Sequence, residues 1–333
     1  MIALLAVLLL VTGGGIVTLL SLQSHLEGQV SRIDGVFDGL DNRPERAGGA
    51  AAKSMNILVM GTDRRSGQQT TGEAATAAEW VPGAQRTDTI MVLHINAARD
   101  DATLISIPRD SWVKVPGHGY NKINAAFSLA GPSLAVETVE DLTGVRIDHL
   151  AVIDWEGFRS LIDSVGGVDV TVPRTVEDTH NDVVWTKGRH HLNGQQALTY
   201  SRQRYGLTMG DIDRVKRQQA ILRSLMRASL STLGSASPTG IYDLLDTLTQ
   251  NVSVDSGWEV GDMRSLMLDM RGMRTGDVNF LTAPVAGFGR EGAQSVVYLD
   301  PADNTSMWDA VREDEVSDWA KTHPLDVLTG PAQ

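Results

Sequence analysis

The first part of the chain is apolar and uncharged, unlike the sequence that follows. Residues 2–22 contain no Asp, Glu, Lys or Arg and are mostly Leu, Ile, Val and Ala. A run of about 20 such residues is long enough to cross the hydrocarbon core of a bilayer. Because no convincing small-residue cleavage site follows it, we expect an uncleaved transmembrane anchor over residues 1–24. Residues 25–53 mix Gly, Ala and charged side chains without sustained periodicity, which predicts a juxtamembrane linker.

Short apolar runs that end in polar loops predict the first strands of a globular domain. Residues 55–60 (MNILVM) form such a run and stop at Gly61, which is typical of a buried strand followed by a loop. Residues 89–96 and 103–107 predict two further strands, and the short polar connection between them indicates a hairpin. Polar and charged side chains gather at the ends of these runs.

Apolar residues at helical spacing predict two long helical regions. In residues 124–144 the spacing is interrupted at Gly131 and Pro132, so we expect two helices, the second ending at Gly144. A longer helix is expected over residues 212–233, where apolar residues return on one face. That face is formed by Val215, Leu222, Met226, Leu230 and Leu233.

The order strand, helix, strand in the middle of the chain indicates the fold class. Strands are expected at residues 149–155 and 168–172, on either side of a helix at residues 156–165. This alternation of strands and helices favours a layered α/β domain. Residues 236–333 contain further helix-like and strand-like pieces, which either complete the same sheet or form a small subdomain.

Composition limits the classes of protein to which this chain can belong. Of its 333 residues, 42% are hydrophobic and 21% are charged, which is the balance of a globular protein. The absence of cysteine excludes disulfides, thiol nucleophiles and cysteine-ligated metal sites. The net charge of −12 argues against a nucleic-acid-binding protein, because such proteins present a broad basic surface.

One strongly basic segment interrupts this acidic chain. Residues 199–227 hold seven Lys and Arg against two Asp. Arg202 and Arg204 alternate as they would on one face of an extended segment, whereas Arg214 and Gln218 lie one helical turn apart. Guanidinium groups match phosphate oxygens in two-point geometry, so clustered arginines favour a phosphorylated ligand. The alternative is a solvated basic helix face.

Acidic and arginine residues also pair at the ends of the first two predicted strands. Asp63 and Arg64 follow the first strand, and Arg86 and Asp88 precede the second. In antiparallel neighbours these two ends are adjacent, so the carboxylates can converge. Carboxylates together with substrate phosphate oxygens are the usual ligands of Mg²⁺, although each Asp alone is also a common turn or cap residue.

Two further sets of polar residues can each be explained by a structural role, without a catalytic or binding function. Pro108 ends a predicted strand and presents Arg109 and Asp110 in the next loop, as in a salt-bridged turn. His190 and His191 are neighbours, and neighbours on a regular element point in different directions. We therefore expect surface positions for these histidines rather than a metal site.

Seven segments in a fixed order carry a resemblance to a known family. They are GTDRR, QRTDTIMVLHIN, TLISIPRD, YNKINAAFSLAG, GGVDVTVP, HHLNGQQALTYSRQR and GDIDRVKRQQ, spread over residues 55–230. Together they resemble the LytR-CpsA-Psr family of bacterial cell-wall ligases. The resemblance implies a catalytic domain at residues 54–235 with a C-terminal extension at residues 236–333. It also implies a three-layer α/β sandwich with a central mixed β-sheet and flanking helices, preceded by one transmembrane helix.

The resemblance further implies an activity and a cellular location. The chain would be a single-pass protein of the bacterial cell membrane with an extracytoplasmic catalytic domain. It would use Mg²⁺, with Mn²⁺ as a possible substitute, to move a glycopolymer from a polyprenyl pyrophosphate carrier to peptidoglycan through a phosphodiester. A polyprenyl tail would lie in the interior of the sandwich. Its partners would be the carrier-linked glycopolymer, the peptidoglycan acceptor and the membrane, but no nucleic acid.

The family motifs imply roles for particular residues of this chain. Asp63 and Asp88 would hold the metal. The pyrophosphate would be bound by Arg86, Arg109, Arg202, Arg204, Arg214, Arg217 and Gln218. The catalytic set would comprise Asp63, Asp88, Arg86, Arg109, Arg202 and Arg204.

Three reactions or roles remain open from the sequence. The same charges could serve hydrolysis by a polyprenyl-pyrophosphate pyrophosphatase or phosphatase, or binding by a non-catalytic polyprenyl-phosphate regulator. Asp63 and Asp88 favour catalysis, because binding an anion does not require two carboxylates beside it. The general base for the acceptor is not assigned, and Asp63 and Asp110 are both candidates.

Overall fold

The computed structural model describes most of the globular part of the chain. The described residues are 26–64, 69–73, 75, 80–203, 206, 211–234 and 238–323. The transmembrane anchor expected over residues 1–24 lies outside them. Among the helices of these ranges, none is both long enough and apolar enough to span a bilayer.

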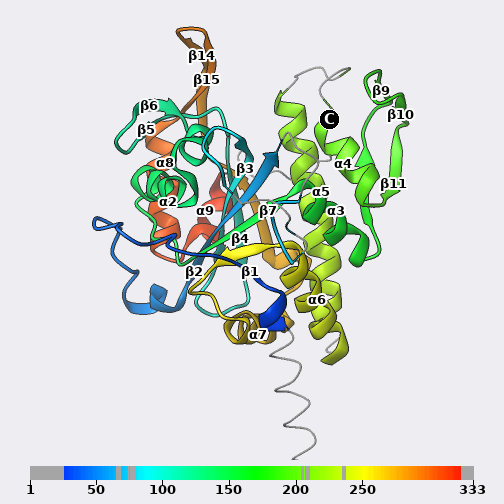
Figure 1. The fold of residues 1–333 in the computed structure, drawn as a ribbon, viewed down its shortest axis with the longest axis horizontal. Helices are drawn as coiled ribbons and strands as arrows, with labels where there is room; N and C mark the ends of the chain where they lie inside the picture. The colour runs from blue at the N-terminus through cyan, green and yellow to red at the C-terminus, as the bar shows by residue number, and fades with distance from the viewer. Residues whose placement is uncertain are drawn as a thin grey trace, which may run out of the picture.

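A seven-stranded mixed sheet forms the centre of the fold (Figure 1). Its strand order is β1-β12-β7-β2-β3-β4-β13, in which the pairs β1·β12, β7·β2 and β4·β13 are parallel and the others antiparallel. The strands are β1 (Ser31–Ile33), β2 (Met55–Arg64), β3 (Gln85–Ile95), β4 (Ala102–Ile107), β7 (His149–Asp154), β12 (Ser253–Asp255) and β13 (Val278–Thr282). The predicted class, α/β with a central mixed sheet and flanking helices, is confirmed.

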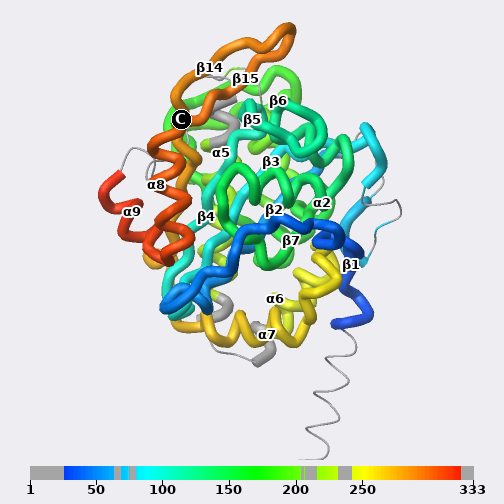
Figure 2. The backbone as a smooth tube through the Cα atoms, turned by 90° about the vertical axis from the view of Figure 1, so that its left-hand side faces the viewer, coloured from blue at the N-terminus to red at the C-terminus, as the bar shows by residue number. Residues whose placement is uncertain are grey.

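Helices cover both faces of this sheet (Figures 1 and 2). Successive side chains of a strand point to opposite faces. Leu58 therefore packs into one apolar cluster with Phe127 and Trp308, and Ile57 packs into another with Leu245. The first face is covered by α2 (Asn124–Thr143), α8 (Pro301–Arg312) and α9 (Val316–Thr322). The second is covered by α3 (Trp155–Ser164), α5 (Asp211–Gly234), α6 (Pro238–Asn251) and α7 (Val260–Asp269).

Smaller elements surround the two layers of helices. Helix α4 (Gly194–Arg202) packs with α3, α5 and β8 in a third apolar cluster. Short 3-10 helices are η1 (Gly49–Lys53), η2 (Met270–Gly272) and η3 (Thr275–Asp277). Four two-stranded ribbons complete the fold. They are β5 (Trp112–Val115) with β6 (Gly119–Lys122), β8 (Val168–Val172) with β11 (Gly188–Leu192), β9 (Val176–Asp178) with β10 (Val183–Trp185), and β14 (Val285–Glu291) with β15 (Gln294–Leu299).

The helix break predicted within residues 124–144 is present in α2. Ala130 and Gly131 have non-helical backbone angles, with φ of 78° at Gly131, and the helix continues from Pro132. Gly144 adopts a left-handed conformation, with φ of 63°, and its N–H caps the last turn. Proline and glycine therefore fix both the kink and the end of this helix.

The strand, helix, strand unit predicted at residues 149–172 exists, but its strands belong to different sheets. β7 lies in the central sheet, whereas β8 pairs with β11 alone in an antiparallel ribbon. The apolar face of β8 is buried against α4 and α5 instead of a neighbouring central strand. Local periodicity predicts a strand but does not identify its pairing partner.

Segments before residue 54 and after residue 235 both contribute strands to the central sheet. The linker expected over residues 25–53 is instead a packed part of the domain, because β1 pairs with β12 and Leu26, Val30 and Ile33 are buried. The C-terminal residues 236–333 supply β12 and β13, so they complete the central sheet. The sheet thus contains strands from both sides of the domain boundary expected at residue 235.

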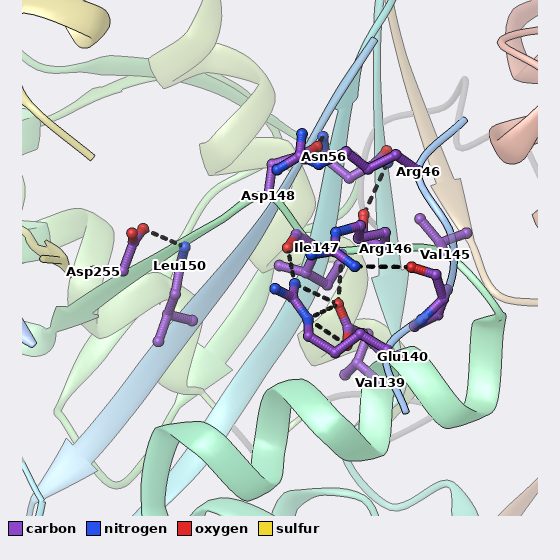
Figure 3. A network of polar contacts seen from close by, with 12 residues as sticks. Arg46, Asn56, Val139, Glu140, Val145, Arg146, Ile147, Asp148, Leu150 and Asp255 are labelled. Atoms are coloured by element: carbon purple, nitrogen blue, oxygen red, sulfur yellow. Dashed lines mark hydrogen bonds and ion pairs between the residues drawn. The ribbon is translucent and has the colours of Figure 1, made fainter. Parts of the chain in front are cut away.

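A buried ion pair fastens the N-terminal segment to the end of α2 (Figure 3). The Glu140 side chain is only 2% exposed, and it accepts hydrogen bonds from Nε and Nη2 of Arg43 and from the N–H of Ile147. Nearby, Arg146 donates to the carbonyl oxygen of Pro44. Charged groups this deep are stable only when paired, so the contacts hold the chain before β2 in one position.

A second buried polar contact joins the β2–β3 pair to the C-terminal helices. His94 is 1% exposed, and its ring nitrogens lie 2.8 Å from Oδ1 of Asn56 and 2.8 Å from Oδ1 of Asp314. Asp314 Oδ2 also accepts the N–H of Ala97. Asp314 has a φ of 65° in the turn between α8 and α9. The contact therefore locks that turn against the sheet.

We predict that Asp314→Asn lowers the free energy of unfolding by about 1–3 kcal/mol at pH 7, because a charged partner of buried His94 is lost. Burial raises the pKa of Asp314, but hydrogen bonds from His94 and from Ala97 N–H outweigh it and leave the pKa below its ordinary value. The stabilisation is therefore present at neutral pH and is lost progressively as the pH falls below about 4. Asparagine tolerates a positive φ, so the substitution adds little backbone strain.

Urea unfolding of the wild type and the variant at pH 7 and at low pH measures this effect. Asp318→Asn is the matched control, because Asp318 is exposed and its pairing with Lys321 lies at the surface. The control is expected to change stability by less than about 0.5 kcal/mol. Equal losses in the two variants at pH 7 would contradict the prediction.

Candidate active site

The pairing of β2 with β3 positions two acidic residues at one end of the sheet. Asp63 lies opposite Arg86 in this antiparallel ladder. The register shifts between Gly61 and Thr62, so that Asp88 is the residue of β3 left without a partner. Such a bulge re-aims the side chain of the extra residue. Asp63 and Asp88 consequently line the same cavity.

This cavity, here called the polar cavity, lies between the end of the sheet and helices α3, α4 and α5. Its volume of about 450 Å³ is within the range of small-molecule sites. The residues that line it include Asp63, Asp88, Trp155, Asp178, Arg202 and Gln218. It therefore combines carboxylates, a guanidinium, an amide and an aromatic ring.

The electrostatic environment of Asp63 shows how closely these charges interact. Burial and the negative charge of Asp88 raise the pKa of Asp63 above its ordinary value. A hydrogen bond with the Arg86 backbone and the charges of Arg109 and Arg202 act in the opposite direction but do not compensate fully. The two carboxylates and two of the predicted arginines thus form one interacting group.

Arg109 belongs to this group through a direct ion pair. It follows β4, and its Nη1 donates to Oδ1 of Asp88. The next residue, Asp110, pairs with Lys122 at 3.0 Å. Asp88, Arg109, Asp110 and Gln218 line a second, smaller cavity of about 50 Å³ on the β4 side of the polar cavity. The arginine predicted from the SIPRD segment is therefore placed beside the carboxylates.

Arg202 reaches the polar cavity from a helix, not from the extended segment expected around it. It is the last residue of α4, which begins with a capping box formed by Asn193 and Gln196. Its guanidinium carbon lies 5.2 Å from the ring centroid of Trp155, within cation–π range. The alternation of Arg202 and Arg204 predicted an extended segment. The capping box and the packing of α4 on α3 instead keep the chain helical up to Arg202.

The other predicted arginines differ in what the structure says of them. Arg86 is exposed on β3, opposite Asp63. Arg204 lies outside the described residues. Arg214 lies in α5, but its side chain is not among those described.

Arg217 is buried between α4 and α5. It is 1% exposed, its guanidinium carbon lies 4.2 Å from the ring centroid of Tyr200, and its Nη1 donates to Oε1 of Gln203. These contacts tie α5 to the end of α4. Because α4 ends at Arg202, these contacts also hold the part of the chain that carries this arginine.

Several residues around the cavities were not predicted from the sequence. Gln219 is buried and donates from Nε2 to Ser106 and Thr282, each at 3.0 Å, which holds α5 over β4 and β13. Asp178 is fully buried and accepts hydrogen bonds from Asn181. Of these residues, only Gln219 could have been identified from the sequence, because it adjoins Gln218 in the arginine-rich segment.

Gln218 lines three neighbouring cavities among the described residues at this end of the sheet. Besides the polar cavity and the small one, it lines a third of about 60 Å³, here called the apolar cavity, over β7, β2 and β3. Val59, Ile153, Phe158 and Leu222 line this apolar cavity. Charged and apolar compartments therefore meet at one side chain.

The donor set fits a metal that needs few protein ligands. Among the described side chains, no three His, Asp or Glu residues converge as a complete metal cage. Mg²⁺ keeps several waters and is often held by one or two carboxylates plus substrate oxygens. Asp63 and Asp88 match that requirement. His190 and His191 lie away from them on β11, where His191 contacts Asp169.

Comparisons with known proteins identify the family to which the chain belongs. The model of the LytR_cpsA_psr family matches residues 27–313. "Cell wall biosynthesis protein LcpA" of Corynebacterium glutamicum is 33% identical over 81% of this chain and 59% of its own length. "Polyisoprenyl-teichoic acid--peptidoglycan teichoic acid transferase TagU" of Enterococcus faecalis is 35% identical over 56% of this chain and 59% of its own length. The chain thus spans about three fifths of these relatives.

A solved structure shares the fold as well. Bacillus subtilis TagV superimposes with a TM-score of 0.63 at 26% identity, over 79% of this chain and 97% of that one. The family model covers most of this sequence, including every segment from which β2, β3, α4 and α5 arise. The chain belongs to the LytR-CpsA-Psr family.

Proposed function

We propose that this protein transfers a glycopolymer from a polyprenyl pyrophosphate carrier to peptidoglycan and forms a phosphodiester. The observation that carries the proposal is the junction of the polar and apolar cavities at Gln218. A lipid-linked pyrophosphate has the same two parts, a doubly charged head and an apolar tail. The related transferase TagU is named for such a reaction with teichoic acid.

The charged groups of the site fit the head of this substrate. Arg109 and Arg202 would neutralise phosphate oxygens, and Arg86, Arg204 and Arg214 are proposed to join them as the site fills. Asp63 and Asp88 would hold Mg²⁺, which when bound would offset the negative charge that repels an incoming hydroxyl. Preorganised charges of this kind act by stabilising the transition state in a phosphoryl transfer. The lipid phosphate would be the leaving group.

The apolar cavity fits the beginning of the lipid tail. Val59, Phe158 and Leu222 would contact its first methylene and methyl groups. The volume of about 60 Å³ is far below the roughly 300 Å³ of the smallest drug-sized pockets, so the cavity matches only the first part of the tail. We further propose that residues 1–24 anchor the protein in the cell membrane with the domain outside the cytoplasm, where such a carrier presents its glycopolymer.

The test incubates the protein with a polyprenyl-pyrophosphate-linked saccharide and peptidoglycan fragments, with and without Mg²⁺. We expect a saccharide joined to peptidoglycan only when Mg²⁺ is present. Release of free saccharide phosphate in place of the joined product would instead identify a hydrolase. Tight binding of the carrier without turnover would identify a non-catalytic regulator.

Asp88→Asn is expected to reduce transfer by about 10²–10³-fold, the usual cost of removing one preorganised electrostatic contact. The substitution keeps the shape of the side chain but removes its charge toward the metal and toward Arg109. Asp169→Asn, which alters an exposed carboxylate on β8, is the matched control and should retain transfer. Full turnover by Asp88→Asn at saturating Mg²⁺ with an unchanged melting temperature would overturn the assignment.

The raised pKa of Asp63 predicts a pH dependence for metal binding. Mg²⁺ requires the ionised carboxylate, so its affinity should begin to fall at a higher pH than for an ordinary aspartate. Burial is the largest cause of the shift and Asp88 the next, so Asp88→Asn should lower the pKa of Asp63. Carboxyl ¹³C NMR titration of Asp63 in both proteins measures this change. A pKa that rises or stays fixed in the variant would show that the two carboxylates do not interact as described.

A further inference from the structure

Two β-hairpins beside the candidate active site carry aromatic side chains that have no role in the proposed reaction. The hairpins are β5–β6 and β14–β15, and both project from the body of the domain on the same side (Figures 1 and 2). Tyr120 and Phe288, one on each hairpin, are 66% exposed and are the most exposed large hydrophobic side chains among the described residues. Grouped aromatic side chains in water commonly mark a binding surface.

The solvent face of β5–β6 alternates aromatic rings with lysines. Trp112 lies opposite Lys122, and Lys114 lies opposite Tyr120, so all four side chains share one face of the hairpin. The rings of Trp112 and Tyr120 stack at a centroid distance of 6.5 Å. Val113 faces the other way into the core. This face is therefore available to a ligand with apolar surfaces and negative charges.

Both hairpins are joined to the active-site wall. Lys122 Nζ lies 3.0 Å from Oδ1 of Asp110, and the N–H of Val297 donates to the carbonyl oxygen of Asp110 at 2.9 Å. Phe288 is paired directly with Val297, so the two side chains share a face of β14–β15. Val297 lines the small cavity together with Arg109. The exposed aromatic residues thus continue outward from the wall that holds Arg109.

The strand order decides which substrate this surface faces. The apolar cavity lies over β7, β2 and β3, whereas the two hairpins follow β4 and β13, which come after β3 in the strand order. Asp88, on β3, lines the small cavity on the β4 side. A phosphoryl transfer places the attacking oxygen in line with, and opposite to, the leaving oxygen. With the leaving lipid in the apolar cavity over β7, β2 and β3, the acceptor hydroxyl approaches from the side of β4 and the hairpins.

We propose that the aromatic platform, defined as Trp112, Lys114, Tyr120, Lys122 and Phe288, binds the glycan strand of the peptidoglycan acceptor. The C–H faces of its sugar rings stack on Tyr120 and Phe288, and its peptide carboxylates pair with Lys114. Pyranose rings combine apolar faces with polar edges, which matches aromatic rings set among charged side chains. The inference rests on the proposed transfer reaction and deepens it by locating the acceptor.

The test is co-sedimentation of the protein with insoluble peptidoglycan from which attached polymers have been removed. Tyr120→Ala combined with Phe288→Ala should weaken binding by about tenfold, as expected when exposed anchor side chains are truncated. Tyr120→Phe keeps the ring and should bind like the wild type. Leu268→Ala, which removes an exposed apolar side chain from α7 at the opposite end of the domain, is the matched control and should also bind normally.

Transfer kinetics then separate this inference from the proposed function. The double variant should raise the KM for peptidoglycan fragments and leave the KM for the lipid-linked donor unchanged. Sedimentation needs no turnover, so loss of binding in the double variant supports the platform even if no transfer is observed. Unchanged sedimentation of the double variant, an equal loss in Leu268→Ala, or a rise confined to the donor KM would overturn it.

Discussion

The antiparallel pairing of β2 with β3 is the constraint on which the candidate site depends. Its ladder is continuous from Met55 to Gly61 and then shifts register by one residue. The regular part is held between two apolar clusters, so the strands cannot slip without exposing a hydrophobic face. The core therefore fixes where the bulge falls, and the bulge brings Asp88 to the cavity that Asp63 also lines.

Two carboxylates so arranged repel each other, and the surrounding arginines make the arrangement tolerable. Arg109 pairs with Asp88, and Arg202 contributes positive charge near Asp63. The balance is incomplete, since the pKa of Asp63 remains raised. A cation between the carboxylates would relieve this repulsion and free the guanidinium groups for an anion. The proposed Mg²⁺ and pyrophosphate would thus balance the remaining charges of this site together.

Buried polar groups beside the cavities hold these charges in place. Arg217 fixes α5 against the end of α4, and Gln219 fixes α5 over β4 and β13 through Ser106 and Thr282. Both are buried polar side chains whose hydrogen bonds are costly to break. Gln218 therefore lines the polar, small and apolar cavities, whereas the neighbouring Arg217 and Gln219 bond to other elements of the protein.

The local elements could be predicted from the sequence alone, and so could several residues that line the polar cavity, namely Asp63, Asp88, Arg202 and Gln218. Apolar periodicity located β2, β3, β4, α2 and α5, and glycine and proline located the kink of α2, because these signals act over a few residues. It did not reveal that β8 leaves the central sheet, that residues 31–33 enter it, or that Arg217 is buried while Gln218 lines the cavities. Those outcomes depend on which apolar faces, distant in the sequence, pack together. Only the tertiary structure decides this, because the burial of a residue depends on the whole packed chain and not on its own segment.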